Sequence, residues 1–170
     1  MTHLLEHANR LVVAIDAIAR ANDALASLAR AQRSAIAGMR TREVADVVAQ
    51  QRAIGRELAD AEESRRTTVR GLCHALKLPE SASLTDLARA VGRHDADVGR
   101  ALATAADHAR KAVLECQGQQ RIVRAAADGI VAHLDGLARQ VLAHANRAGV
   151  YASTGALSGS QALRGVDLVS

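Results

Sequence analysis

The chain has 170 residues, enough for one domain or one elongated bundle, and it is 49% hydrophobic but only 1% aromatic. With one tyrosine and no phenylalanine or tryptophan, a globular core would lack large anchors, so helices packed through small side chains are favoured. The net charge is +4, yet the 22 basic and 18 acidic residues are mixed along the chain, which excludes the basic stripe with interleaved aromatics typical of a nucleic-acid partner.

Residues 2–38 are expected to form the first helix. Their apolar positions recur in steps of four and three, a pattern typical of a coiled-coil seam. The seam consists of Leu4, Ala8, Leu11, Ile15, Ile18, Leu25, Ala29, Ile36 and Met39. Asn22 and Gln32 interrupt it, and polar residues in a seam commonly fix the register between helices. Gly38 and Thr41 then predict a C-cap followed by an N-cap.

A second helix is expected over residues 41–78, because a further apolar stripe follows Thr41 and Pro79 excludes the helical conformation from the residue before it. The stripe consists of Val44, Val48, Gln51, Ile54, Leu58, Ala61, Arg65, Val69, Leu72 and Leu76. Its middle, residues 62–66, is too polar to be buried deeply. The short connection to the first helix predicts an antiparallel hairpin.

Two more helices follow. Ser83 as N-cap, with Asp86 in the first turn, predicts a short helix over residues 84–92. A long helix is expected over residues 94–149, which contain no proline and carry one apolar stripe. At about 1.5 Å per residue it would be about 80 Å long, so other helices must lie alongside to bury the stripe.

Four glycines weaken the long helix, at positions 99, 118, 129 and 136, and each costs about 1 kcal/mol of helix propensity relative to alanine. The last two, at positions 129 and 136, lie in the second half of the helix. We therefore expect that half to be only marginally helical alone and to gain stability from a partner that buries its stripe.

These elements predict an all-α fold: an elongated antiparallel helical hairpin or coiled-coil bundle with a long C-terminal helix, over residues 1–149. Residues 150–170 are rich in serine and glycine and are expected to form a flexible polar tail. The N-terminus lacks the apolar run of a signal peptide, and no segment is apolar enough to span a bilayer. A cytoplasmic protein without stable membrane insertion is therefore expected.

No residue pattern points to an enzyme. Cys73 and Cys116 fall on apolar helix faces, which is typical of buried, reduced thiols. His3 and His7 have the spacing to clamp a metal, but no third ligand accompanies them. The Glu-x-x-His motif of di-iron bundles, a glycine-rich phosphate loop and an exposed nucleophile turn are all missing. We expect no catalytic residue, no metal and no cofactor.

Two alternatives stay open for a helical protein of this kind. His133, followed by Leu134, Asp135 and Gly136, is superficially similar to the phosphoacceptor helix of histidine phosphotransfer domains, although the lysine of that motif is missing. The first alternative is therefore a phosphotransfer-like four-helix signalling bundle. The second is a structural coiled-coil adaptor, which would form a stable homodimer on its own.

Three segments carry a resemblance to a known family. They are Glu62, Arg65, Arg66, Val69, Leu72 and Leu76 before Pro79; the short run Leu84, Thr85, Asp86, Leu87 and Ala88; and Tyr151 with Gly155. In the same order they are similar to a Glu-x-x-Arg followed by leucines and a proline, a short middle helix and a Tyr-x-x-x-Gly-like tail. The sequence thus resembles the FlgN family of flagellar export chaperones.

The resemblance implies a cytosolic chaperone of flagellar type III export. Such a chaperone holds the C-terminal helical region of the hook-filament junction (hook-associated) proteins FlgK and FlgL, largely through its last helix, and hands them to the export apparatus. A client helix would dock with anchors at i, i+3, i+4 and i+7. The residues expected to bind it are Val123, Ile130, Leu134, Leu137 and Val141, extended by Tyr151 and Leu157.

Overall fold

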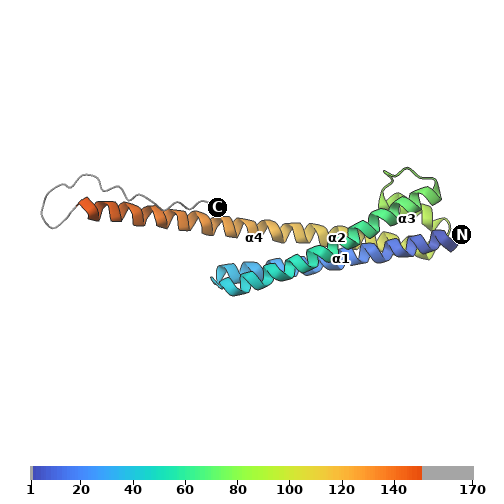
Figure 1. The fold of residues 1–170 in the computed structure, drawn as a ribbon. Coiled ribbons are helices and arrows are strands. Elements are labelled where there is room, and N and C mark those ends of the chain that lie inside the picture. The colour runs from blue at the N-terminus through green and yellow to red at the C-terminus, as the bar shows by residue number, and fades with distance from the viewer. Residues whose placement is uncertain (1, 151–170) are drawn as a thin grey trace. The chain divides into compact units, whose positions relative to one another are not determined.

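The computed structural model describes residues 2–150, and over that range it contains four α-helices and no strand (Figure 1). They are α1 (Thr2–Ala37), α2 (Thr41–Leu76), α3 (Leu84–Gly92) and α4 (Ala96–Val150). The all-α fold with a long C-terminal helix, predicted from the helical spacing of apolar residues, is confirmed.

The chain divides into two compact units, Met1–Ala127 and Asp128–Ser170. The first unit contains α1, α2, α3 and the first part of α4, and it holds the hydrophobic core. The second unit contains the last part of α4. The division falls inside α4, whereas the sequence suggested one boundary, at the start of the tail.

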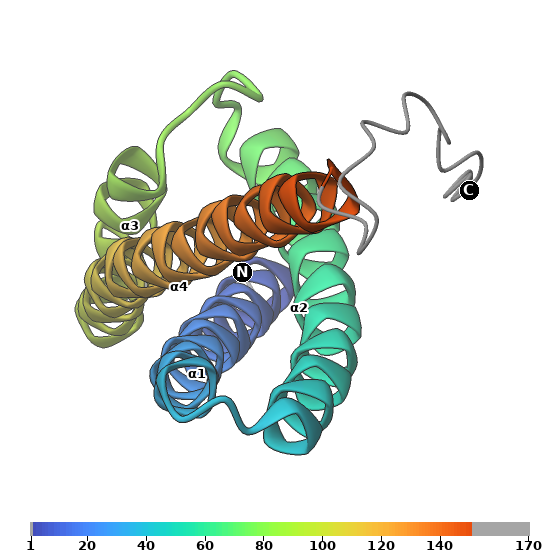
Figure 2. The same cartoon turned by 90° about the vertical axis from the view of Figure 1, so that its left-hand side faces the viewer.

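A tight connection turns α1 back along α2, and Figure 2 shows the two helices side by side. The N–H of Arg40 donates to the carbonyl of Ala35 at 2.9 Å, and the N–H of Met39 donates to the carbonyl of Ile36 at 3.0 Å. This pair of bonds is a Schellman motif. The expected antiparallel hairpin is present, and Gly38 follows the last helical residue as the expected C-cap, but the expected N-cap differs. Met39 takes the left-handed conformation, with φ 52°, and Arg40 instead of Thr41 occupies the N-cap without a side-chain hydrogen bond.

The core lies where α1 meets α2, α3 and the start of α4. Its buried members are Ala8, Leu11, Ile15, Leu72, Cys73, Leu87, Ala88, Val91, Leu102 and Ala105. The seam of α1 supplies Leu11 and Ile15, both almost fully buried, as the four-and-three spacing predicts. Each large aliphatic side chain buried this way contributes roughly 1.5–3 kcal/mol, which is how a chain without large aromatics still forms a core.

The two polar residues of the α1 seam behave differently. Gln32 accepts a hydrogen bond from the side-chain amide of Gln51 on α2 at 3.0 Å, so it links the two helices. Asn22 is buried but donates to the carbonyl of Ile18, one turn back in its own helix, at 2.8 Å. The prediction that polar seam residues fix the register therefore suits Gln32 and fails for Asn22.

The first part of α4 runs parallel to α1. His108 pairs with Asp23 at 3.2 Å and Arg30 pairs with Glu115 at 3.1 Å, and in both pairs the residues are 85 positions apart. These pairs are about half exposed and add little stability, but the equal separation establishes one register. In this register the last residue of α1, Ala37, is level with Ile122 of α4.

The ends of α2 and α4 depart slightly from expectation. Helix α2 stops at Leu76 instead of residue 78, because Lys77 adopts φ 51° and the N–H of Leu78 bonds back to the carbonyl of Cys73 at 2.9 Å. Helix α4 begins at Ala96 instead of residue 94. The carboxylate of Asp95 caps it by accepting from the N–H of Asp97 at 2.9 Å, so the first turn starts one residue after this cap.

Candidate partner-binding surface

The apolar stripe of α4 is buried in its first half. Leu102, Ala105, Ala112 and Cys116 are all less than 5% exposed. Beyond Cys116 the burial declines, and Val123 is half-buried. The sequence shows one continuous stripe, whereas in the structure only the part within the α1 register is covered.

In the second unit, large aliphatic side chains of α4 are exposed to solvent. The exposed fractions are 58% for Val131, 57% for Leu134, 43% for Leu137, 67% for Val141 and 59% for Leu142. Ile130 is half-buried and precedes them on the helix. We call these six residues the open face. Large contiguous apolar patches are rare on monomers and commonly mark interaction sites.

The open face has a definite shape, which follows from 3.6 residues per helical turn. Ile130, Leu134, Leu137 and Val141 follow in steps of four, three and four and form one narrow stripe. Val131 and Leu142 lie about 100° round the helix axis from the narrow stripe, and they widen the apolar surface on that side. The result is an apolar surface wider than a simple coiled-coil seam.

The borders of the narrow stripe carry no carboxylate or guanidinium group. Ala138 shares one border with Val131, and His133 and Gln140 form the other. The charged side chains Asp128 and Arg139 lie on the side of the helix opposite the narrow stripe, whereas Asp135 lies about 20° round the helix from Leu142, at the outer edge of the open face. A partner of the narrow stripe would therefore meet aliphatic groups with few ion pairs.

The structure brings together three of the residues expected to bind a client, Leu134, Leu137 and Val141, on one exposed surface, with Ile130 half-buried beside them. Val123 belongs to the other unit. Tyr151 and Leu157 lie outside the described residues. The sequence analysis missed Val131 and Leu142 because it followed a single stripe. Their spacing of eleven, three helical turns, was the available signal.

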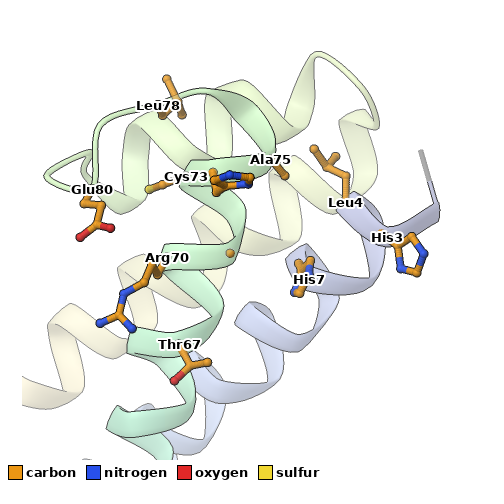
Figure 3. Close-up of a pocket in the computed structure, with 11 residues that line it drawn as sticks. His3, Leu4, His7, Thr67, Arg70, Cys73, Ala75, Leu78 and Glu80 are labelled. Atoms are coloured by element: carbon orange, nitrogen blue, oxygen red, sulfur yellow. The ribbon is translucent and has the colours of Figure 1, made fainter.

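A cleft lies elsewhere, at the end of the hairpin where α1 begins and α2 ends (Figure 3). It has a volume of about 640 Å³, and its lining includes His3, His7, Arg70, His74 and Glu80. The closest neighbour of a Cβ on Gly71 would be the ring of His7, at 3.5 Å. The imidazole of His7 therefore packs on α2 beside Gly71, at ordinary van der Waals distance.

This cleft does not gather the ligands that a metal needs. The side chain of His3 is 94% exposed and pairs with Glu6 of its own helix at 3.7 Å. Among the residues that the structure describes, no group of three or more His, Cys, Asp or Glu side chains is placed to hold a metal ion.

The other residues considered for chemistry lie apart from one another. His133 is exposed on α4, next to Leu134 of the open face. Cys73 and Cys116 are buried free thiols. Burial raises the pKa of Cys73, with a further contribution from the negative charge of Glu80, and burial also raises the pKa of Cys116. Both thiols thus favour the protonated form, whereas a thiolate nucleophile requires a lowered pKa.

Within residues 2–150, none of the helices combines the length and the hydropathy needed to cross a bilayer. Comparison with known proteins adds no relative: no family model matches the sequence, and no curated protein or solved structure matches it either.

Proposed function

We propose that this protein is a helix-binding chaperone that holds a client through the open face of α4. The observation that carries the proposal is the exposure of Val131, Leu134, Leu137, Val141 and Leu142 within twelve positions of one helix. Aliphatic side chains at steps of three and four bury best against another helix with the same spacing.

The energetics suit reversible binding. Covering one large aliphatic side chain contributes roughly 1.5–3 kcal/mol to the free energy of binding. The cost of the translational and rotational freedom that the client loses must be subtracted from the sum. A face of six such residues can therefore support binding that is specific yet releasable. Gly129 and Gly136 weaken the helix beneath the face, and no atom lies within 4 Å of a Cβ built on either. A client that covers the face would stabilise this part of α4.

The proposed client class follows from the resemblance to the FlgN family. We propose that the client is the C-terminal helical segment of the hook-filament junction proteins FlgK and FlgL, held in the cytoplasm before type III export. Helix-in-groove recognition needs no cofactor and no turnover, which suits the aliphatic character of the open face.

A charged substitution in the open face tests the proposal. Leu137→Glu places a carboxylate where the client helix would pack, so the fluorescently labelled C-terminal segment of FlgK or FlgL should bind about 30-fold or more weakly. Because Leu137 is 43% exposed, the helical circular dichroism of the full chain should be unchanged. The matched control is Leu114→Glu, which alters a leucine on the same helix that is 60% exposed and lies outside the open face.

Loss of binding in Leu137→Glu with retention in Leu114→Glu supports the proposal. Equal binding by both variants and the unmodified chain would refute it. A loss of helicity together with binding in Leu137→Glu would assign Leu137 to the fold and not to the interface.

A further inference from the structure

We propose that residues 151–170 of this same chain cover the open face of α4 when no client is bound, so that a client must displace them. This inference rests on the proposed function for its consequence, but the covering itself can be tested without any client.

The composition of this segment matches the chemistry of the open face. Its large aliphatic side chains are Leu157, Leu163, Val166, Leu168 and Val169. Among its 20 residues only Arg164 and Asp167 are charged. The narrow stripe has uncharged borders, with Val131 and Ala138 on one side and His133 and Gln140 on the other. An occupant with few charges loses little hydration of ionic groups when it packs there.

The length of the segment also suffices. Helix α4 ends at Val150, which is about 14 Å along the axis from Val141 and about 30 Å from Ile130, at about 1.5 Å per residue. Twenty extended residues span up to about 66 Å. The segment can therefore reverse direction and still bring residues 163–169 over the whole face. Gly155 and Gly159 lie before this aliphatic part. Glycine adopts right-handed and left-handed backbone conformations with equal ease, so the chain can reverse direction at these positions.

Attachment to α4 favours this occupant over a second molecule. A short connection gives the segment an effective concentration in the millimolar range at the face, well above the concentration of free chains in a typical micromolar solution. The entropic cost of closing the loop grows only with the logarithm of its length. If the segment covers the face in nine molecules of ten, the apparent affinity for a client is about tenfold weaker than the intrinsic affinity.

A spin label on the full chain tests the covering directly. The substitution Ser160→Cys accepts a nitroxide, while the native Cys73 and Cys116 are buried and should not be labelled. In methyl NMR spectra, we expect the signals of Leu134, Leu137 and Val141 to be broadened more strongly than those of Ala132 and Ala143. These two exposed alanines lie on the opposite side of α4 and serve as the internal control.

A matched variant separates packing from mere proximity. Replacing Leu163, Val166, Leu168 and Val169 by serine in the labelled chain keeps its length but removes the aliphatic groups. We expect the preferential broadening to disappear and the affinity for the FlgK or FlgL C-terminal segment to rise about tenfold.

Several results would overturn the inference. One is equal broadening on both sides of α4 in the unmodified chain. Another is broadening that arises only when labelled and unlabelled chains are mixed, which would identify a second copy as the occupant. If the serine variant binds the client no more tightly than the unmodified chain, the covering has no regulatory role, whereas the proposed function stands or falls on Leu137→Glu.

Discussion

Gly99 of α4 lies in backbone contact with Gly92, the last residue of α3. A Cβ built on Gly99 would lie 2.5 Å from the Cα of Gly92 and 2.9 Å from the carbonyl oxygen of Ala88. Real Cβ atoms essentially never approach so closely, and the neighbours are backbone atoms that cannot rotate away. Gly99 is therefore the residue that lets the start of α4 pack directly on α3.

This contact predicts that Gly99→Ala destabilises the protein. Overpacking costs about 1–3 kcal/mol and the gain in helix propensity returns about 1 kcal/mol, so the free energy of unfolding should fall by up to about 2 kcal/mol. Gly92→Ala is the control, since its Cβ would meet Gly99 at an ordinary 3.8 Å. Urea denaturation measures both variants, and equal stability of the two would contradict the packing described.

Gly136→Ala should have the opposite effect. A Cβ on Gly136 meets nothing within 4 Å, so the substitution gains about 1 kcal/mol of helix propensity without a clash. Backbone amides of residues 128–144 should then exchange with deuterium about fivefold more slowly. Gly55→Ala on α2, which is equally open, should leave those amides unchanged. An unchanged exchange rate in Gly136→Ala would show that helix propensity does not limit the stability of this part of α4.

Met39→Gly should stabilise the hairpin. Met39 holds a left-handed conformation, which costs a residue with a side chain roughly 1–2 kcal/mol, and its side chain is 81% exposed, so little packing is lost. After the extra flexibility of glycine in the unfolded chain is subtracted, the free energy of unfolding should rise by about 0.5–1 kcal/mol. Met39→Ala keeps the strain and should show no such rise in thermal or urea denaturation.

The capping box of α3 should make stability depend on pH. The hydroxyl of Ser83 donates to the carboxylate of Asp86 at 2.7 Å and its backbone N–H donates at 3.3 Å, and these bonds, with the nearby Arg89, hold the pKa of Asp86 below its ordinary value. A lowered folded-state pKa adds stability that is fully present above the unfolded value of about 3.9 and is lost as the pH falls through the folded value.

The unmodified chain should accordingly be more stable than Asp86→Asn at pH 7, and this difference should vanish once the pH has fallen below the lowered pKa of Asp86 in the folded chain. Urea denaturation at several pH values measures it. Ser83→Ala removes the side-chain hydrogen bond that is the largest cause of the lowered pKa of Asp86. NMR titration of that variant should therefore give a pKa closer to the ordinary value. A difference that persists at low pH would mean that the ionised carboxylate does not stabilise α3.

Local patterns in the sequence were sufficient to predict the helices and several of their ends. Ser83 and Asp86 form the expected capping box, and α2 ends before Pro79. The left-handed residues Met39 and Lys77 were not predicted, because sequence signals for that conformation depend on glycine and asparagine. Here the backbone hydrogen bonds of the Schellman motif offset the strain.

The open face depends on information that no local pattern contains. The sequence shows a uniform stripe along α4, and only the pairing of Asp23 with His108 and of Arg30 with Glu115 reveals how far α1 extends along it. The close backbone approach at Gly99 could not be predicted from local patterns either, since it depends on how α3 crosses α4. Local spacing therefore predicted the narrow stripe, whereas its exposure required the register between helices.

The central claim is that the open face of α4 takes a guest helix. Titration of the methyl-labelled full chain with the C-terminal segment of FlgK or FlgL tests it most directly, with chemical-shift changes as the measurement. We predict saturable shifts for Leu134, Leu137 and Val141, with the core residues Leu11 and Leu72 unchanged. Shifts confined to the core, or a client that binds while the open face stays unperturbed, would contradict the account.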